Sequence, residues 1–104
     1  MGTSSARFFE PYESDPDNVG RWRRLMVDED GQMVEGQFLQ YLVGADRAGL
    51  QLTVHAIGDE ANHLLLNYQD ALIGENGPRD RRFRLVHAQV IAPEDFERMG
   101  ELGI

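Results

Sequence analysis

Two short apolar runs, each ending in Val-His-Ala, dominate the hydrophobic pattern of the chain. The first covers residues 50–54 and is followed by His55, and the second covers residues 83–86 and is followed by His87. Each run is followed by residues with helical spacing, which is typical of a buried strand that leads into a helix. The pattern therefore predicts a strand, helix, strand unit. Both histidines are expected at the carboxyl ends of neighbouring strands, where α/β proteins place their chemistry.

Helical spacing surrounds the two predicted strands. Before the first strand, apolar residues recur at spacings of four, four and three between Val34 and Ala45, and Gly49 stands where a helix C-cap is expected. Between the strands, residues 61–72 carry one apolar stripe, and Asp59 is well suited to cap that helix. These patterns predict one helix before the first strand and a second helix between the strands.

A third helix is predicted after the second strand. It is expected to begin at residues 92–95 with Pro93 at its first helical position, and to turn Phe96 and Met99 inward. Residues 1–27 contain turn signals without a sustained period and are predicted to form a long loop. Residues 28–104 are therefore expected to form helix, strand, helix, strand and helix, in that order.

The chain length limits what this pattern can build. A complete (β/α)₈ barrel needs about 250 residues, whereas this chain has 104. Two parallel strands with about three helices leave sheet edges unpaired, and a two-stranded sheet is marginal by itself. We therefore expect residues 1–104 to be a single fragment of a larger α/β protein, one that forms homo-oligomers if it folds alone.

Composition excludes several classes of protein. A hydrophobic content of 41% and a charged content of 27% indicate a globular chain, and no apolar run approaches the length of a membrane span. The net charge of −8 argues against nucleic acid or anionic membrane as a partner, and the basic stretch at residues 79–84 is interpreted as a solvated loop plus a structural arginine at the start of the second strand. The absence of cysteine and of an apolar leader favours a cytoplasmic protein.

The histidine pair is the strongest chemical signal. A lone histidine beside an apolar strand is usually a packing residue, but His55 and His87 are expected at matching strand ends. Side chains at the same level on adjacent strands are about 5 Å apart, so two imidazoles can share one divalent metal. Imidazole suits zinc, iron, manganese and nickel alike. Two ligands are too few for a catalytic centre, so the others must come from outside the chain or from its acids.

Three further residues carry open alternatives. Asp59 is interpreted as a helix cap, or as a hydrogen-bond acceptor that orients His55. Gln89 is expected on the same face as His87 if the strand continues, where it contacts metal ligands or substrate; otherwise it satisfies loop backbone. His63, on the helix after the first strand, is interpreted as a surface or packing histidine. These residues are the candidate support of the metal site.

Longer motifs around the histidines carry a family resemblance. His55-Ala-Ile-Gly-Asp59 is followed by Ala61-Asn62, and Arg84-Leu-Val-His87-Ala-Gln89 is followed by Pro93-Glu94-Asp95. In motif, order and spacing these segments resemble the paired signatures of the YtcJ-like branch of the metal-dependent amidohydrolases. The flanking segments are similar to the middle region of that family as well, at residues 8–12, 17–20 and 45–50.

The resemblance implies a (β/α)₈ TIM-barrel fragment around the fifth and sixth strands, with residues 1–27 following the fourth. It implies a hydrolase of carbon–nitrogen amide bonds in small-molecule substrates, with His55 and His87 as ligands of one or two divalent ions, zinc being the expected one. The family's His-x-His pair, its eighth-strand aspartate and its fourth-strand lysine have no counterpart in this chain, and Val86 replaces a common glutamate. The fragment alone is therefore expected to be inactive and can be metal-free. The alternative is a non-catalytic remnant that self-associates through exposed sheet edges.

Overall fold

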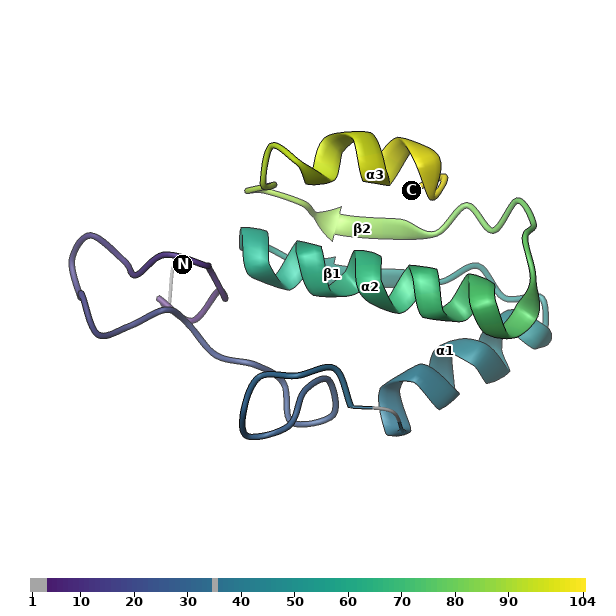
Figure 1. The fold of residues 1–104 in the computed structure, drawn as a ribbon, viewed down its shortest axis with the longest axis horizontal. Helices are drawn as coiled ribbons and strands as arrows, with labels where there is room; N and C mark the ends of the chain where they lie inside the picture. Colours follow the sequence, from purple (N-terminus) through teal and green to yellow (C-terminus); the bar gives the residue numbers. More distant parts are fainter. Residues whose placement is uncertain (1–3, 35) are drawn as a thin grey trace.

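The computed structural model describes residues 4–34 and 36–104 and has a small α/β fold (Figure 1). Within this part of the chain, two strands and three helices alternate in the predicted order. They are α1 (Gln37–Arg47), β1 (Thr53–Ala56), α2 (Asp59–Asn76), β2 (Arg84–His87) and α3 (Asp95–Glu101). The carboxyl ends of the strands, the start of α2 and the N-terminal segment, residues 4–34, all gather at the left end of Figure 1.

The two strands are adjacent and parallel, as the crossover through α2 requires. Val54 and Leu85 are register partners and pack against the buried core, whereas His55 lies on the opposite face and is exposed. Thr53 and its partner Arg84 are exposed on that same face. One face of the sheet is thus covered by helices, and within the described residues the other is largely bare.

The core lies between the covered face of the sheet and α2. It is built from the buried residues Val27, Leu42, Ala56, Leu64, Leu65, Tyr68, Leu72 and Phe83. The Tyr68 hydroxyl donates to the Met26 carbonyl at 2.5 Å, so the N-terminal segment is held to the middle of α2. Burial of this phenol raises its pKa above the ordinary value of 10.0, and a hydrogen bond with the backbone of Val34 opposes that shift.

Helix α1 ends as predicted, because Gly49 supplies the left-handed turn after the C-cap with a φ of +78°. The Leu50 N–H donates to the Ala45 carbonyl and the Gly49 N–H donates to the Asp46 carbonyl, which is the Schellman pattern. The predicted strand at residues 50–54 is displaced, because β1 begins only at Thr53. Leu50 is 59% exposed, and pairing starts where Arg84 lies opposite.

Asp46, near the end of α1, anchors a buried polar cluster. Its carboxylate accepts from Asn76 at 2.8 Å and from Arg81 at 3.0 Å, and Arg79 lies 2.6 Å away. Burial acts to raise the pKa of Asp46, but these hydrogen bonds and positive charges outweigh it and hold the pKa below 3.8. Two arginines of the basic stretch at residues 79–84, Arg79 and Arg81, are therefore structural, whereas the sequence predicted a solvated loop with one structural arginine at the start of the second strand.

The N-terminal segment is bound closely to the start of α2. Arg7 donates to the Glu60 carboxylate through Nε at 2.5 Å and Nη2 at 3.2 Å. The Phe9 N–H donates to Asp59 at 3.0 Å. A Cβ on Gly58 would lie only 1.9 Å from the Arg7 carbonyl oxygen, so the backbones touch at a place where only glycine fits.

Helix α3 differs from its prediction. It begins at Asp95, with Pro93 in the turn before it rather than at the first helical position. Phe96 is 64% exposed, so the prediction that it faces inward is wrong for the described residues. The buried residue of that turn is Asp95, which is 1% exposed, because its carboxylate is drawn to partners on α2 and so turns Phe96 outward.

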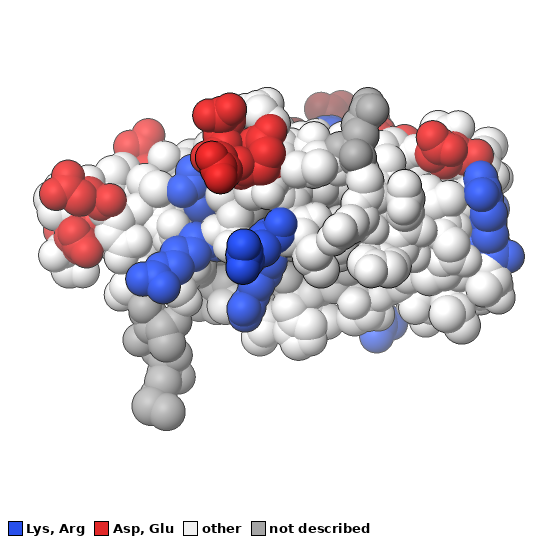
Figure 2. Space-filling view, turned by 90° about the horizontal axis from the view of Figure 1, so that it is seen from below, with Lys and Arg blue, Asp and Glu red and all other residues white. Residues whose placement is uncertain are grey.

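Charge is distributed unevenly over the surface. Figure 2 shows arginines gathered on one part of the face seen from below, in the half of the molecule that contains the N-terminal segment. Acidic side chains lie mostly along the upper border of the same view. None of the described helices is both long and apolar enough to span a bilayer.

Candidate metal centre

The two strand-end histidines meet, as the sequence predicts. The Nδ1 of His55 and the Nε2 of His87 are 3.1 Å apart, and the ring centroids are 5.1 Å apart. At this distance one imidazole N–H donates to the facing nitrogen of the other ring. Both histidines are exposed in the described chain.

The way in which the histidines meet was not predicted. His55 is paired with Val86, and His87 is paired with Ala56, so the histidines lie one register position apart. In regular strands that offset would put the two imidazoles on opposite faces of the sheet. His87 has a φ of 76° and Ala88 has a φ of 43°, so the backbone turns out of extended geometry and the His87 ring comes to His55.

The spacing of the two rings fits a shared metal. Two nitrogens that each lie about 2.05 Å from a tetrahedral ion are separated by about 3.3 Å, close to the 3.1 Å between His55 and His87. The described residues contain no group of three or more His, Cys, Asp or Glu side chains placed to hold an ion. The pair is thus suitable as two ligands of a centre that needs others.

A cavity of about 590 Å³ opens beside the histidine pair. Its wall combines both imidazoles, the turn after β1 and the N-terminal segment. Several of its residues are basic or aromatic, namely Arg7, Arg21, Trp22 and Arg23. The volume is in the range of small-molecule sites, which is about 300–1,000 Å³.

Comparison with known proteins identifies the family. The model of a family described as "Amidohydrolase family" matches residues 1–104. The chain belongs to the amidohydrolase family. Members of this family are generally metal-dependent, which agrees with a paired-imidazole site at the ends of two strands. This match concerns the family as a whole. The branch of the family and the strands of the barrel to which the chain corresponds remain implications of the sequence resemblance.

Two curated relatives cover the whole chain. "Protein LONG AFTER FAR-RED 3" of Arabidopsis thaliana is 39% identical over 104 residues, which make up 16% of that protein. "Putative amidohydrolase YtcJ" of Bacillus subtilis (strain 168) is 34% identical over 104 residues, or 17% of its length. The chain therefore spans about a sixth of the length of these two relatives. No solved structure matches the chain.

Asp59 takes a different place from either interpretation. It is the first residue of α2 rather than the cap, which is Gly58. Its carboxylate accepts from its neighbour's N–H, that of Glu60, at 2.7 Å and from the Phe9 N–H at 3.0 Å. Asp59 thus binds the loop that walls the cavity, and its described partners do not include His55.

Gln89 is exposed, and its predicted alignment with His87 depended on a continuing strand. Since β2 ends at His87 and the next residue is also left-handed, the extended geometry does not continue. Gln89 therefore does not share a strand face with His87. Its contact with substrate or metal ligands stays a prediction.

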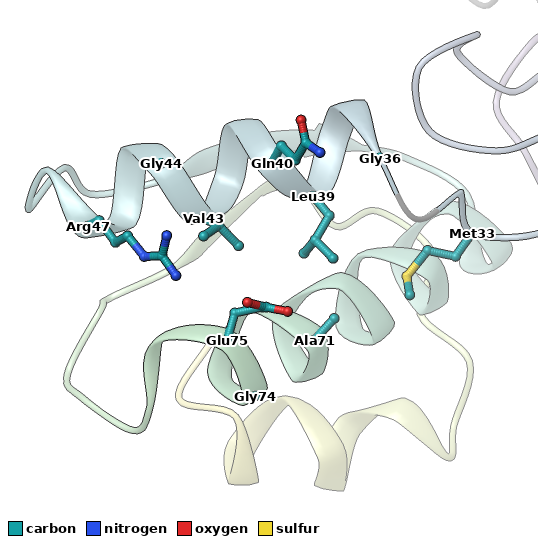
Figure 3. Close-up of a pocket in the computed structure, with 10 residues that line it drawn as sticks. All are labelled: Met33, Gly36, Leu39, Gln40, Val43, Gly44, Arg47, Ala71, Gly74 and Glu75. Carbon is teal, nitrogen blue, oxygen red and sulfur yellow. The ribbon is translucent and has the colours of Figure 1, made fainter.

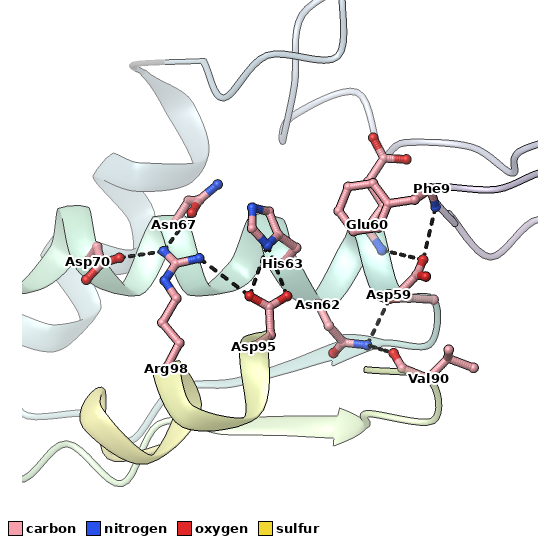
Figure 4. A network of polar contacts seen from close by, with 11 residues as sticks. Phe9, Asp59, Glu60, Asn62, His63, Asn67, Asp70, Val90, Asp95 and Arg98 are labelled. Carbon is pink, nitrogen blue, oxygen red and sulfur yellow. Dashed lines mark hydrogen bonds and ion pairs between the residues drawn. The ribbon is translucent and has the colours of Figure 1, made fainter. Parts of the chain in front are cut away.

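Asn62 and His63 form supports that sequence reasoning missed (Figure 4). The buried Asn62 amide donates to the carbonyls of Gly58 at 2.8 Å and Val90 at 3.0 Å, which joins the loops after both strands. His63 Nδ1 lies 3.0 Å from both carboxylate oxygens of Asp95. The interpretation of His63 as a surface or packing histidine leaves out this contact, through which His63 holds α3 against α2.

Arg98 extends this network along α2. Its guanidinium donates to Asn67 at 2.7 Å and to Asp70 at 2.5 Å, and lies 3.7 Å from Asp95 (Figure 4). The sequence gives a signal for only one part of this arrangement: Asp95 lies in the first turn of α3, where the helix dipole favours an acidic residue. The separation of 31 residues between Arg98 and Asn67 hides their contact.

A second groove in the described residues lies away from the histidines. It measures about 760 Å³ and runs between α1 and α2, where glycines and short side chains separate the helices (Figure 3). Arg47 and Glu75 stand at one end of it and Met33 at the other. Neither His55 nor His87 lines this groove, so size alone does not mark the chemical centre.

Proposed function

We propose that the chain is the β5–β6 portion of an amidohydrolase (β/α)₈ barrel and supplies two metal ligands, His55 and His87, to the active site. The intact enzyme hydrolyses a carbon–nitrogen amide bond in a small molecule. The observation that carries this proposal is the 3.1 Å separation of the His55 and His87 nitrogens, which suits two ligands of one ion.

The two faces of the sheet support placement in a barrel. Helices cover the face of Val54 and Leu85, as on the outside of a barrel. The face of His55 is exposed in the described chain, as expected for an inner surface whose other strands belong to the rest of the protein. Covering by further strands would also pair the free edges of β1 and β2.

The roles of the residues follow from their positions. A divalent ion held here, with zinc as the expected one, would lower the pKa of a bound water and polarise the amide carbonyl. His55 and His87 would hold that ion through the two ring nitrogens that now face each other. Asp59 fixes the N-terminal segment beside the cavity. Gln89 stands after the second ligand, where it can contact substrate. The general base comes from outside the chain.

Metal content tests the proposal directly. The intact enzyme and its variants His55→Ala and His87→Ala are purified with metal and compared for bound ion and amide hydrolysis. Each substitution is expected to lower metal content and to reduce turnover by at least about a hundredfold. His63→Gln is the matched control, because it removes the third histidine but keeps a hydrogen-bond donor near Asp95. Undiminished metal content and turnover in both alanine variants would refute the proposal.

A second candidate is a non-catalytic domain that associates with its own copies. Tyr41 at 65% and Phe96 at 64% exposure are large apolar side chains on the surface, and one sheet face is bare. Light scattering and a zinc titration on the 104-residue chain separate the two functions. A stable oligomer that binds no zinc, and whose assembly does not depend on either histidine, favours the association domain. A cytoplasmic location and a homo-oligomeric state are proposed for both.

A further inference from the structure

Three arginines line the cavity beside the histidines, and two of them form no ion pair among the described residues. Arg7 is engaged, because it binds Glu60 and its guanidinium lies 5.2 Å from the Trp22 ring centroid. Arg21 and Arg23 also line the cavity, yet neither forms an ion pair with any carboxylate in residues 4–34 or 36–104. Their guanidiniums are therefore available to a ligand.

The charge balance of the chain makes this arrangement informative. The protein has a net charge of −8, and some arginines outside the N-terminal segment, among them Arg81 and Arg98, bind carboxylates of their own, whereas Arg47 and Arg84 form no ion pair in residues 4–34 or 36–104. Two arginines without an ion pair in the described chain therefore line one cavity of an acidic protein. A planar guanidinium binds carboxylate or phosphate through paired hydrogen bonds, which are stronger than bonds between neutral groups.

We propose that Arg21 and Arg23 form a subsite for an anionic group of the substrate, a carboxylate or a phosphate. The inference rests on the proposed function, because it takes the cavity at His55 and His87 as the substrate site. The amide to be cleaved lies at the histidine end, and the anionic group lies at the arginine end of the same cavity. The substrate is thus a small amide with a negative charge away from the scissile bond.

Trp22 provides an optical probe of this subsite. It is the single tryptophan of the chain, it stands between the two arginines in sequence, and it lines the same cavity. Its fluorescence can be followed in the metal-free 104-residue chain at constant ionic strength. The ligands are N-acetylglycine, its neutral analogue N-acetylglycinamide, and inorganic phosphate.

Variants with equal charge change isolate the two arginines. Arg21→Gln with Arg23→Gln removes the subsite, whereas Arg24→Gln with Arg82→Gln removes the same charge from arginines that do not line the cavity. We expect saturable binding of N-acetylglycine by the unaltered chain and by the control, at least about tenfold weaker binding by the subsite variant, and no saturation with the neutral amide. Tighter binding of phosphate than of N-acetylglycine would assign the group as a phosphate.

The proposal fails if N-acetylglycine and phosphate cause no saturable change, if the neutral amide binds as well, or if both double variants weaken binding equally. Circular dichroism is used to check that the substitutions at these exposed arginines leave the fold unchanged. In the intact enzyme the subsite variant should raise KM for an anionic amide about tenfold and leave kcat for a neutral amide unaltered. Because the fluorescence assay contains no metal, anion binding by the 104-residue chain together with no amide hydrolysis by the metal-loaded intact enzyme would refute the proposed function and leave the subsite standing.

Discussion

The close approach of Gly58 to the N-terminal segment gives the sharpest structural prediction. Gly58 has a φ of −78° and a ψ of 160°, a conformation that alanine adopts without strain. The obstacle to Gly58→Ala is space alone. Its Cβ would lie 1.9 Å from the carbonyl oxygen of Arg7 and 2.6 Å from the carbonyl carbon. Backbone cannot yield as a flexible side chain does, so the N-terminal segment must move away from α2.

The cost of this substitution combines the steric overlap with the hydrogen bonds that a displaced segment gives up. Overpacking a close-fitting site destabilises by about 1–3 kcal/mol. Displacement of the segment also weakens the bonds from Phe9 N–H to Asp59 and from Arg7 to Glu60. Each is worth about 0.5–1.5 kcal/mol net. We expect Gly58→Ala to lower the free energy of unfolding by about 2–4 kcal/mol, or to release the segment at a similar cost.

Gly74→Ala is the matched control. Gly74 lies within α2, which continues to Asn76, and a Cβ added to it would meet nothing within 4 Å. Alanine there should stabilise the helix by about 0.5–1 kcal/mol. Urea unfolding followed by circular dichroism measures both variants, and Trp22 emission reports locally on the segment. An unchanged midpoint and unchanged emission for Gly58→Ala would show that the segment does not rest on Gly58.

Two further predictions concern buried polar groups. Because the folded-state pKa of Asp46 is lowered below 3.8, its contribution is fully present above about pH 4 and is lost as the pH falls through the folded value. The midpoint temperature of thermal unfolding should therefore fall less steeply between about pH 7 and about pH 2 for Asp46→Asn than for the unaltered chain. Parallel curves of midpoint against pH would contradict this. Asn62→Ala leaves the carbonyls of Gly58 and Val90 without their donor. It should cost about 2 kcal/mol or more in urea unfolding, whereas the half-buried Asn67→Ala should cost less.

The order of the elements could be predicted from sequence because it depends on local periodicity. The apolar runs before His55 and His87 and the stripe in α2 each contain their own evidence. The boundaries could not be predicted as well, since β1 begins where Arg84 lies opposite Thr53. Strand limits thus depend on a partner that is distant in the chain rather than on the apolar run.

The sequence predicts that the two histidines meet because both end parallel strands, whereas in the structure they meet because the backbone turns at His87. The sequence places both residues at strand ends, but it contains no sign of the register offset or of the left-handed backbone at His87. Left-handed backbone is ordinarily signalled by glycine, which is absent there. The burial of Asp95 and the outward turn of Phe96 are equally hidden, because they are decided by the cross-helix contact with His63.

The left-handed backbone at His87 also means that selection for stability alone would favour loss of this histidine. A residue with a side chain at that φ costs about 1 kcal/mol relative to glycine. A library screened only for heat resistance should therefore enrich His87→Gly, which relaxes the backbone and discards the imidazole. Thermal stability and the imidazole therefore make opposite demands on position 87. Designers who copy this pair into another parallel sheet must copy the turn with it, or the two rings will lie on opposite faces of that sheet.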